Sequence, residues 1–297
     1  MNILFCTDGS DTSYHALKKA LNFLEKDSLI DIFYVIDWGF FPTYVTFPTE
    51  EDLYTSSREV AQIIIGKTEE IIFNNGFTTN KKEYINGNPA SQILEKISNE
   101  NYDLVIMGSH GKRGIANWLG SVSRKVVSHS SIPVFIAREP QDKKSETAKD
   151  KYEIVFASDG SSFSYNAIQK TAKIFDLSKF DINILTVSPG VETLPVEITM
   201  DKAWLELCIE KQKEITNEIL LKAVNIFKDI NINVTNEIIL EGNVAEEIIK
   251  YLEKSSCNLI VMGSHGREGI SEFLLGSVSK RVLSNVYIPV LIVPLVK

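Results

Sequence analysis

The chain has 297 residues, of which 44% are hydrophobic and 24% are charged. Two domains of about 150 residues fit this length, and the composition excludes disordered and collagen-like proteins. The formal net charge of -8 argues against binding to a nucleic-acid backbone, because a surface for that purpose needs a basic stripe.

The cysteines and the apolar segments indicate where the protein works. Three cysteines are present, Cys6, Cys208 and Cys257, and none lies in a C-x-x-C pair, so a reducing compartment is expected. The apolar run at the amino terminus is shorter than the ~7–15 residues of a signal-peptide core. No window reaches the ~18–20 uncharged apolar residues that cross a bilayer. We therefore expect a cytoplasmic protein that does not bind membranes.

The first half of the chain alternates short apolar runs with longer amphipathic stretches. Such runs, rich in β-branched residues, are typical of strands buried on both faces of a parallel sheet. They occupy 3–6, 32–36, 104–108 and 133–137, with a more polar edge strand at 81–85. A helix is predicted over 50–75, because it opens with acidic residues and stops at Gly76. Another begins at Pro89, directly after the cap residue Asn88.

The second half of the chain repeats the first. Residues 2–10 return as 153–161, 102–111 as 257–266 and 120–137 as 276–293, in the same order. A charged segment without periodicity separates the copies and is predicted to be a solvated linker. The sequence therefore predicts an α/β protein of two tandem doubly wound parallel-sheet domains, flavodoxin- or Rossmann-like, with five strands each. The expected boundaries are 1–140 for the first domain, 141–151 for the linker and 152–297 for the second domain.

Two short motifs follow predicted strands in each half, at the edge where an open parallel sheet binds its ligands. The first motif is Asp-Gly-Ser, at 8–10 and 159–161, and the second is Gly-Ser-His-Gly, at 108–111 and 263–266. Glycines allow a phosphate to approach the backbone closely, and the first N–H groups of a helix point toward an anion. The pattern is therefore typical of a site for a phosphate chain.

A structural interpretation of the same residues stays open. Glycines at strand ends also serve tight turns, and Ser10, Asp11 or Ser161 could simply cap the following helix. A lone Gly-x-x-Gly favours this interpretation. A third element, the Gly-Ser pair at 120–121 and 276–277, begins the last helix of each half and favours the phosphate site.

Both halves resemble universal stress protein domains, and the whole chain resembles a tandem universal stress protein of the UspA type. The resemblance rests on Asp-Gly-Ser, on Met-Gly-Ser-His-Gly, and on the Gly-Ser-Val-Ser helix that leads to Ile-Pro-Val. The ATP-binding branch of that family carries Gly-x2-Gly-x9-Gly-(Ser/Thr). The second half matches this motif fully, whereas the first half has eight residues between Gly111 and Gly120 instead of nine. One missing residue turns a helix by about 100°, so we expect ATP with Mg²⁺ to bind better in the carboxyl-terminal half.

The resemblance also implies a residue for each part of the nucleotide. In the second half, Asp159 would hold the adenosine end and Val187 would lie beside the base. The ribose and phosphates would be cradled by Gly263, His265, Gly266, Gly276, Ser277 and Val278. The corresponding residues of the first half are Asp8, Val35, Gly108, His110, Gly111, Gly120, Ser121 and Val122.

The sequence lacks a Walker A motif, a G-x-G-x-x-G motif and the spacing of a catalytic triad or metal site. We therefore expect a binding protein rather than an enzyme, with slow ATP hydrolysis left open. The leading interpretation is a stress-response protein that binds an adenine nucleotide and meets its partners according to its nucleotide state. The alternative is a nucleotide-independent interaction module for a protein or hydrophobic ligand, which the aromatic segment 37–48 suggests. The resemblance further implies that the two domains pair as a pseudo-dimer through 132–137 and 288–293, and it leaves a homodimer open.

Overall fold

The computed structural model describes residues 1–37, 50–111, 119–139, 151–190, 198, 201–266 and 275–295. The chain divides into two compact units, Met1–Pro140 and Gln141–Lys297. The aromatic segment 37–48 and the linker 141–151 fall almost wholly outside the described residues, so both expectations about them stay predictions.

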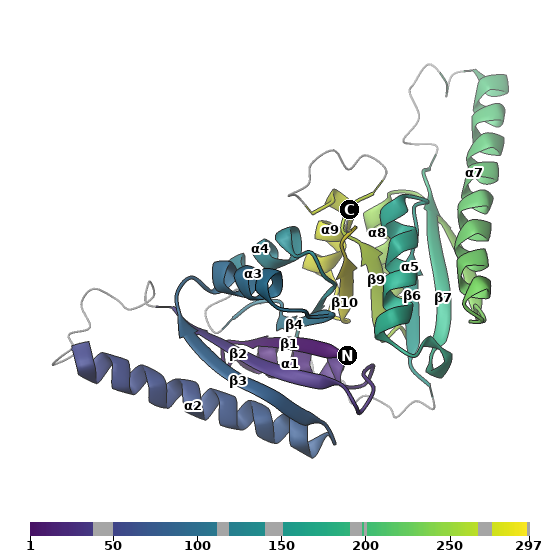
Figure 1. The fold of residues 1–297 in the computed structure, drawn as a ribbon. Coiled ribbons are helices and arrows are strands. Elements are labelled where there is room, and N and C mark those ends of the chain that lie inside the picture. The colour runs from purple at the N-terminus through teal and green to yellow at the C-terminus, as the bar shows by residue number, and fades with distance from the viewer. Residues whose placement is uncertain are drawn as a thin grey trace. The chain divides into compact units, whose positions relative to one another are not determined.

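Strands and helices alternate along the first unit. They are β1 Asn2–Thr7, α1 Asp11–Ala20, β2 Leu29–Ile36, α2 Glu50–Asn74, β3 Thr78–Asn86, α3 Pro89–Asn99, β4 Leu104–Gly108, α4 Ser121–His129 and β5 Val134–Ala137. Hydrogen bonding orders the strands β3-β2-β1-β4-β5, and each neighbouring pair is parallel. The chain changes direction across the sheet between β1 and β4, so the unit is a doubly wound α/β domain (Figure 1).

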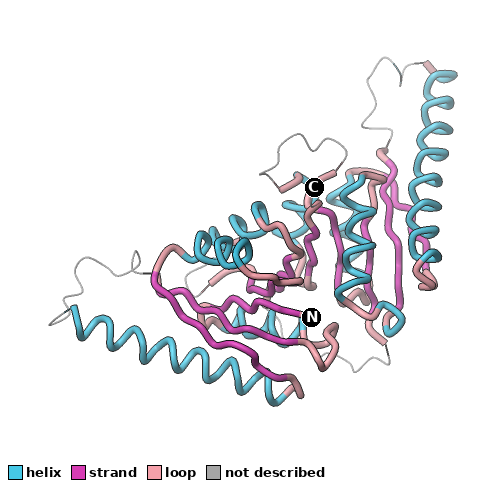
Figure 2. The backbone as a smooth tube through the Cα atoms, in the orientation of Figure 1, coloured by secondary structure: helices cyan, strands magenta, loops and turns pink. Residues whose placement is uncertain are grey.

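The second unit has the same plan (Figure 2). Its elements are β6 Glu153–Ala157, α5 Ser162–Ile174, the short 3₁₀-helix η2 Leu177–Lys179, β7 Asp181–Ser188, α7 Lys202–Asp229, β8 Asn236–Glu241, α8 Val244–Lys254, β9 Leu259–Gly263, α9 Ser277–Asn285 and β10 Val290–Val293. The strand order is β8-β7-β6-β9-β10, again with parallel neighbours. Here the change of direction lies between β6 and β9.

The predicted fold class and several predicted element boundaries are confirmed. Each unit carries the five parallel strands that the sequence indicated, and the polar run at 81–85 lies in β3, the outer strand of the first unit's order. The helix predicted from residue 50 ends at Asn74, and Gly76 follows it with a φ of 76°. Pro89 begins α3, and the side chain of Asn88 accepts a hydrogen bond from the Ser91 N–H.

The core of each unit lies between the sheet and its helices because the strands are apolar on both faces. All of β4 and β9 is buried, as are the inner residues of β1 and β6. In the second unit the Phe156 ring of β6 meets the Phe227 ring of α7 edge-on, with centroids 4.9 Å apart. Burial of these apolar strands therefore stabilises the centre of each sheet. The motifs described below lie at the carboxyl ends of the same strands.

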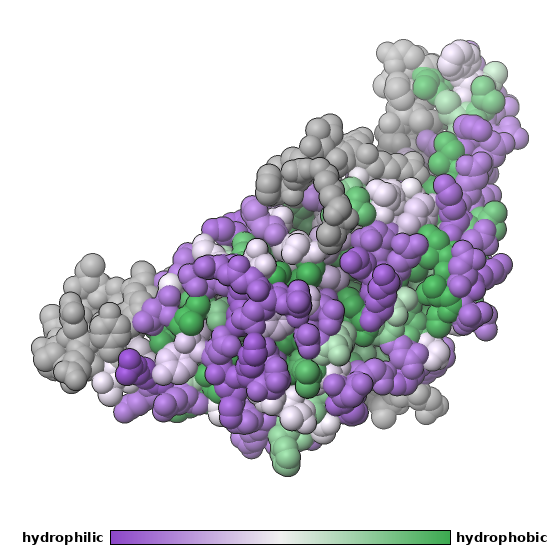
Figure 3. All heavy atoms as spheres, in the orientation of Figure 1, coloured by the Kyte–Doolittle hydropathy of each residue, from purple (hydrophilic) through white to green (hydrophobic). Residues whose placement is uncertain are grey.

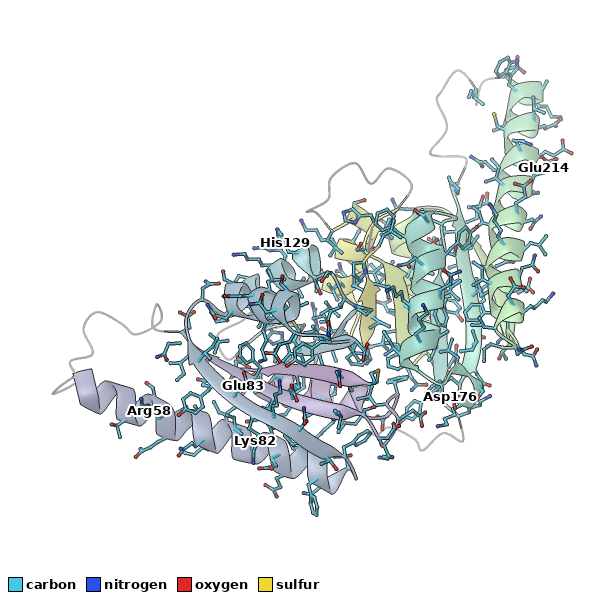
Figure 4. The ribbon with its side chains drawn as sticks, in the orientation of Figure 1. Arg58, Lys82, Glu83, His129, Asp176 and Glu214 are labelled. Atoms are coloured by element: carbon cyan, nitrogen blue, oxygen red, sulfur yellow. The ribbon has the colours of Figure 1, made fainter. Side chains whose placement is uncertain are left out.

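Two neighbouring residues of β3 show how helices cover both faces of the sheet. Lys82 and Glu83 are labelled in Figure 4, and successive side chains of a strand point to opposite faces. The Lys82 ammonium lies 3.0 Å from Glu69 of α2, whereas Glu83 lies 2.7 Å from Lys96 of α3. Helices α2 and α3 thus pack on opposite faces of the sheet, as a doubly wound fold requires.

The two longest helices are α2, with 25 residues, and α7, with 28. A helix of about 20 residues matches the thickness of a bilayer core, so length alone does not decide whether these helices could cross one. Hydropathy must be considered together with length, and no helix in the described part of the chain is both long and apolar enough to span a membrane.

A cluster of charged side chains links β2, β3 and α3 in the first unit. Lys96 is only 8% exposed, and its ammonium donates hydrogen bonds to Glu83 (2.7 Å) and Glu100 (2.6 Å). The Tyr102 hydroxyl donates to the buried Asp31 carboxylate at 2.8 Å. Hydrogen bonds from Lys96 and Lys81 hold the pKa of Glu100 down at about 2.

We expect this cluster to make the first unit sensitive to acid. A carboxyl group whose pKa is lower in the folded chain stabilises the fold above its ordinary pKa and loses that contribution as the pH falls. For Glu100 the loss should run from about pH 4.5 down to about pH 2. Glu100→Gln should therefore lower the free energy of unfolding at pH 7 by about 1 kcal/mol and flatten its decline in this window. Urea unfolding followed by circular dichroism at stepped pH measures both, and an unchanged acid profile would contradict the expectation.

Candidate functional site

The Asp-Gly-Ser motif ends the first strand of each unit and starts the next helix. The Asp8 carboxylate accepts hydrogen bonds from the N–H (3.1 Å) and the hydroxyl (2.6 Å) of Ser10. The Ser10 hydroxyl in turn accepts the Ser13 N–H at 3.2 Å and so caps α1. Asp159 and Ser161 repeat this arrangement before α5, with distances of 3.0 and 2.6 Å. Ser10 and Ser161 are therefore helix caps, as the structural interpretation predicted, and each turn presents a carboxylate at the carboxyl edge of its sheet.

The glycines of the second motif lie against neighbouring chain segments. A Cβ atom on Gly108 would lie 3.0 Å from the Ser13 nitrogen, and one on Gly263 would lie 2.8 Å from the Phe163 Cβ. A Cβ on Gly266 would lie 2.7 Å from the Asp159 carboxylate. The neighbours of Gly108 and Gly263 are backbone or Cβ atoms with little room to move, so packing already favours glycine at these two positions before any ligand is considered, whereas the Asp159 carboxylate is the end of a flexible side chain. The structure also brings the two motifs of each unit into contact.

The Gly-Ser pair that begins the last helix occupies the same place in both units. The Gly120 N–H donates to the Ser109 carbonyl, and the Gly276 N–H donates to the Ser264 carbonyl, both at 2.8 Å. A Cβ on either glycine would lie 3.2 Å from the Cα of the preceding histidine, His110 or His265. The shorter spacing of the first half therefore does not displace the start of α4. The preference for the second domain, which we predicted from that spacing, stays a prediction and needs another physical basis.

The amino termini of α4 and α9 differ from those of the other helices whose caps the structure describes. A side chain accepts a first-turn N–H at the start of the other five α-helices with described caps; these caps are Ser10, Asn88, Ser161, Asp201 and Asn243. The cap positions before helices α4 and α9 are Gly120 and Gly276, so both helices lack a side-chain cap, and neither has an acidic residue in the first turn. Uncapped N–H groups and the positive end of the helix dipole form a ready site for an anion.

The two histidines of the Gly-Ser-His-Gly motifs have different surroundings. Each ring nitrogen Nδ1 is hydrogen-bonded to the preceding serine hydroxyl, at 2.9 Å for His110 and 3.0 Å for His265. The Nε2 atom of His110 lies 3.4 Å from the Thr12 hydroxyl. The Nε2 atom of His265 is buried and has no hydrogen-bond partner among the described residues. Burial lowers the pKa of both imidazoles, and the Arg138 guanidinium lowers that of His110 further.

The remaining predicted residues also lie along the carboxyl edge. Thr7 at the end of β1 pairs with Tyr34, so Val35 lies one step beyond, next to Asp8 in the register; Val187 lies near the end of β7. Val122 and Val278 lie in the first turns of α4 and α9. All four valines are half-buried.

Sequence reasoning missed Thr12 and Phe163, which contact the two histidines. The repeat offers a signal for them, because they are equivalent positions filled by unlike residues. Three basic residues that follow the glycine loops in the sequence, Lys112, Arg113 and Arg267, lie outside the described residues. Within the described ranges, no three His, Cys, Asp or Glu side chains gather in a group that could hold a metal ion.

The fold and this edge define a class: tandem doubly wound α/β domains with glycine-rich loops at the carboxyl ends of their sheets. The model of the universal stress protein family matches residues 1–138 and 152–294, and the chain belongs to that family. The predicted tandem resemblance is thereby confirmed.

Individual relatives agree with this assignment. A universal stress protein of Methanocaldococcus jannaschii is 39% identical over 143 residues, which is 47% of this chain and 80% of the relative. A universal stress protein of Synechocystis sp. is 22% identical over 326 residues, with 98% of each chain covered. The crystal structure of a universal stress protein from Archaeoglobus fulgidus has a TM-score of 0.67 and 23% identity, and the match covers 99% of this chain and 96% of that one. This last similarity extends the shared fold over both domains.

Proposed function

We propose that this universal stress protein binds an adenine nucleotide, ATP with Mg²⁺, at the carboxyl edge of its sheets and better in the second domain. The observation that carries the proposal is the uncapped start of α9, placed by a 2.8 Å hydrogen bond beside the glycine loop that ends β9. A phosphate at this place would accept hydrogen bonds from the first-turn N–H groups of α9, which no side chain caps. In a stress response, this cytoplasmic protein would bind its partners according to whether a nucleotide is bound.

The residues present fit such a ligand. The loop begins and ends with a glycine, Gly263 and Gly266, and the unpartnered Nε2 atom of His265 between them is a polar group that a ligand oxygen would satisfy. We assign Asp159 to the adenosine end, Val187 to the base, and the α9 start at Gly276, Ser277 and Val278 to the phosphates. In the first domain the same roles fall to Asp8, Val35 and the start of α4 at Gly120, Ser121 and Val122. A bound nucleotide would supply the negative charge that these N–H groups attract.

We propose binding rather than catalysis as the activity. Efficient phosphoryl transfer needs a base or water-positioning residue beside the metal, and neither the motifs nor their contacts nominate one. The bound nucleotide would instead change the stability of the folded protein. A nucleotide at a hundredfold excess over its dissociation constant would stabilise the folded chain by roughly 2.7 kcal/mol.

Replacing one carboxylate in each domain of the full chain tests this proposal. In Asp159→Asn the remaining side-chain oxygen can still accept from Ser161, so the turn is kept, while an acceptor for the ligand becomes a donor. We expect ATP affinity to fall about ten-fold, because hydrogen bonds to charged groups contribute about 1.5–3 kcal/mol. Asp8→Asn is the matched control and should change the affinity much less. Isothermal titration calorimetry with ATP and Mg²⁺ measures both, and no heat of binding in the wild type would refute the proposal.

A second candidate function is a nucleotide-independent interaction module. Helix α7 exposes large apolar side chains, with Trp204 at 62%, Leu207 at 63% and Leu221 at 60%, and hydrophobic residues alternate with hydrophilic ones along it (Figure 3). The glycines would then serve only the packing described above. Native mass spectrometry of the purified protein separates the two candidates. Bound nucleotide supports the first, whereas its absence together with no thermal shift on adding ATP supports the second.

A further inference from the structure

One position distinguishes the two otherwise similar sites. Thr12 and Phe163 each stand two residues after the capping serine, Ser10 or Ser161, in the first turn of α1 or α5. Both contact the histidine of the glycine loop in their own domain. The rest of the local framework is the same, from the carboxylate that binds the capping serine to the serine that binds Nδ1.

The two residues treat the imidazole in opposite ways. The Thr12 hydroxyl lies 3.4 Å from Nε2 of His110, within reach of a hydrogen bond. The Phe163 ring lies with its centroid 5.1 Å from that of His265, at an angle of 48° between the planes. A phenyl ring covers the imidazole but accepts no hydrogen bond in the ring plane. The Nε2 atom of His265 therefore stays without an acceptor in the described part of the second domain.

We propose that Phe163 is a positioning residue that keeps Nε2 of His265 free of protein acceptors, so that this nitrogen donates to a phosphate oxygen of the bound nucleotide. The inference rests on the proposed function and adds a physical basis for the preference between the domains. The 3.0 Å contact between the Ser264 hydroxyl and Nδ1 fits the tautomer in which the hydroxyl donates to Nδ1 and the ring proton resides on Nε2, which is then a donor. In the first domain the Thr12 hydroxyl contacts the equivalent nitrogen, Nε2 of His110, and a ligand there must compete with this hydroxyl.

The energetic logic follows from burial. A buried donor without an acceptor costs free energy, and an acceptor brought by the ligand recovers that cost on binding. A donor already paired within the protein exchanges one hydrogen bond for another and gains less. The same nucleotide should therefore bind more tightly where the histidine is covered by Phe163 than where it is paired with Thr12.

Two isosteric substitutions in the full chain test the role of Phe163. Phe163→Thr recreates the arrangement of the first domain, whereas Phe163→Val has the same shape as threonine without the hydroxyl. Both remove the same ring, so both should lower the melting temperature equally. We expect Phe163→Thr to bind ATP about five-fold more weakly than Phe163→Val, the effect of about one net hydrogen bond. Calorimetry with ATP and Mg²⁺ measures this ratio.

A second readout needs no nucleotide. The imidazole ¹⁵N shifts of the free protein report whether Nε2 is hydrogen-bonded. Loss of the ring affects both variants equally, so we expect a further change of the His265 Nε2 signal in Phe163→Thr relative to Phe163→Val, and a change of the His110 signal in the opposite direction in Thr12→Val. Equal shifts and equal affinities of the two Phe163 variants would overturn the inference. Failure of the wild type to bind ATP would instead overturn the proposed function, which the carboxylate variants test separately.

Discussion

Ser277→Asp is expected to weaken ATP binding by about ten-fold or more without loss of folding stability. Ser277 is the first residue of α9, is exposed, and begins a helix that has no side-chain cap. A carboxylate in the first turn interacts favourably with the helix dipole, by about 0.3–1 kcal/mol, so the folded chain should be as stable as the wild type or slightly more stable. The same charge repels a phosphate, and two charges 4 Å apart near a protein surface interact by about 4 kcal/mol.

Two control variants make this expectation specific. Ser277→Ala removes the hydroxyl without adding charge and should change the affinity by less than about three-fold, since a neutral hydrogen bond contributes about 1 kcal/mol or less. Ser121→Asp places the same charge at the start of α4 and should leave the tighter site unaffected. Calorimetry gives the affinities and thermal unfolding gives the stabilities. An unchanged ATP affinity in Ser277→Asp would place the phosphates away from α9.

The fold follows closely from local sequence signals. Runs such as 104–108 have no polar position, which only a strand covered on both faces tolerates, and their repetition at 259–263 sets the second sheet. Asn88 followed by Pro89 marks the start of α3 because a side-chain cap and a fixed φ act within one turn. These effects are local or nearly so, and the sequence shows them directly.

The site could be predicted only in outline. The motifs at the strand ends meet as expected, because parallel strands bring their carboxyl ends to one edge. The consequence of one missing residue could not be predicted from the spacing, since Gly120 and Gly276 make the same contacts with the glycine loop of their own domain although the spacings differ. The contrast between Thr12 and Phe163 depends on side-chain contacts across about 100 residues, which no periodicity reveals.

The close packing around the loop glycine Gly263 has a measurable consequence for stability. Gly263→Ala should lower the free energy of unfolding of the second domain by about 1–3 kcal/mol, the usual cost of overpacking. The added Cβ would lie 2.8 Å from the Phe163 Cβ and 2.9 Å from the Phe163 carbonyl carbon, and backbone there has little room to move. Urea unfolding followed by circular dichroism measures the change.

Gly66→Ala is the matched control for this prediction. Gly66 lies inside α2, and a Cβ there would have no atom within 4 Å. The same substitution should raise stability by about 1 kcal/mol, because alanine is the better helix former. Opposite signs for the two variants would show that packing demands the glycine of the loop with or without a nucleotide. A neutral Gly263→Ala would mean that the loop has space to spare, and close approach of a ligand would then be the reason for glycine at this position.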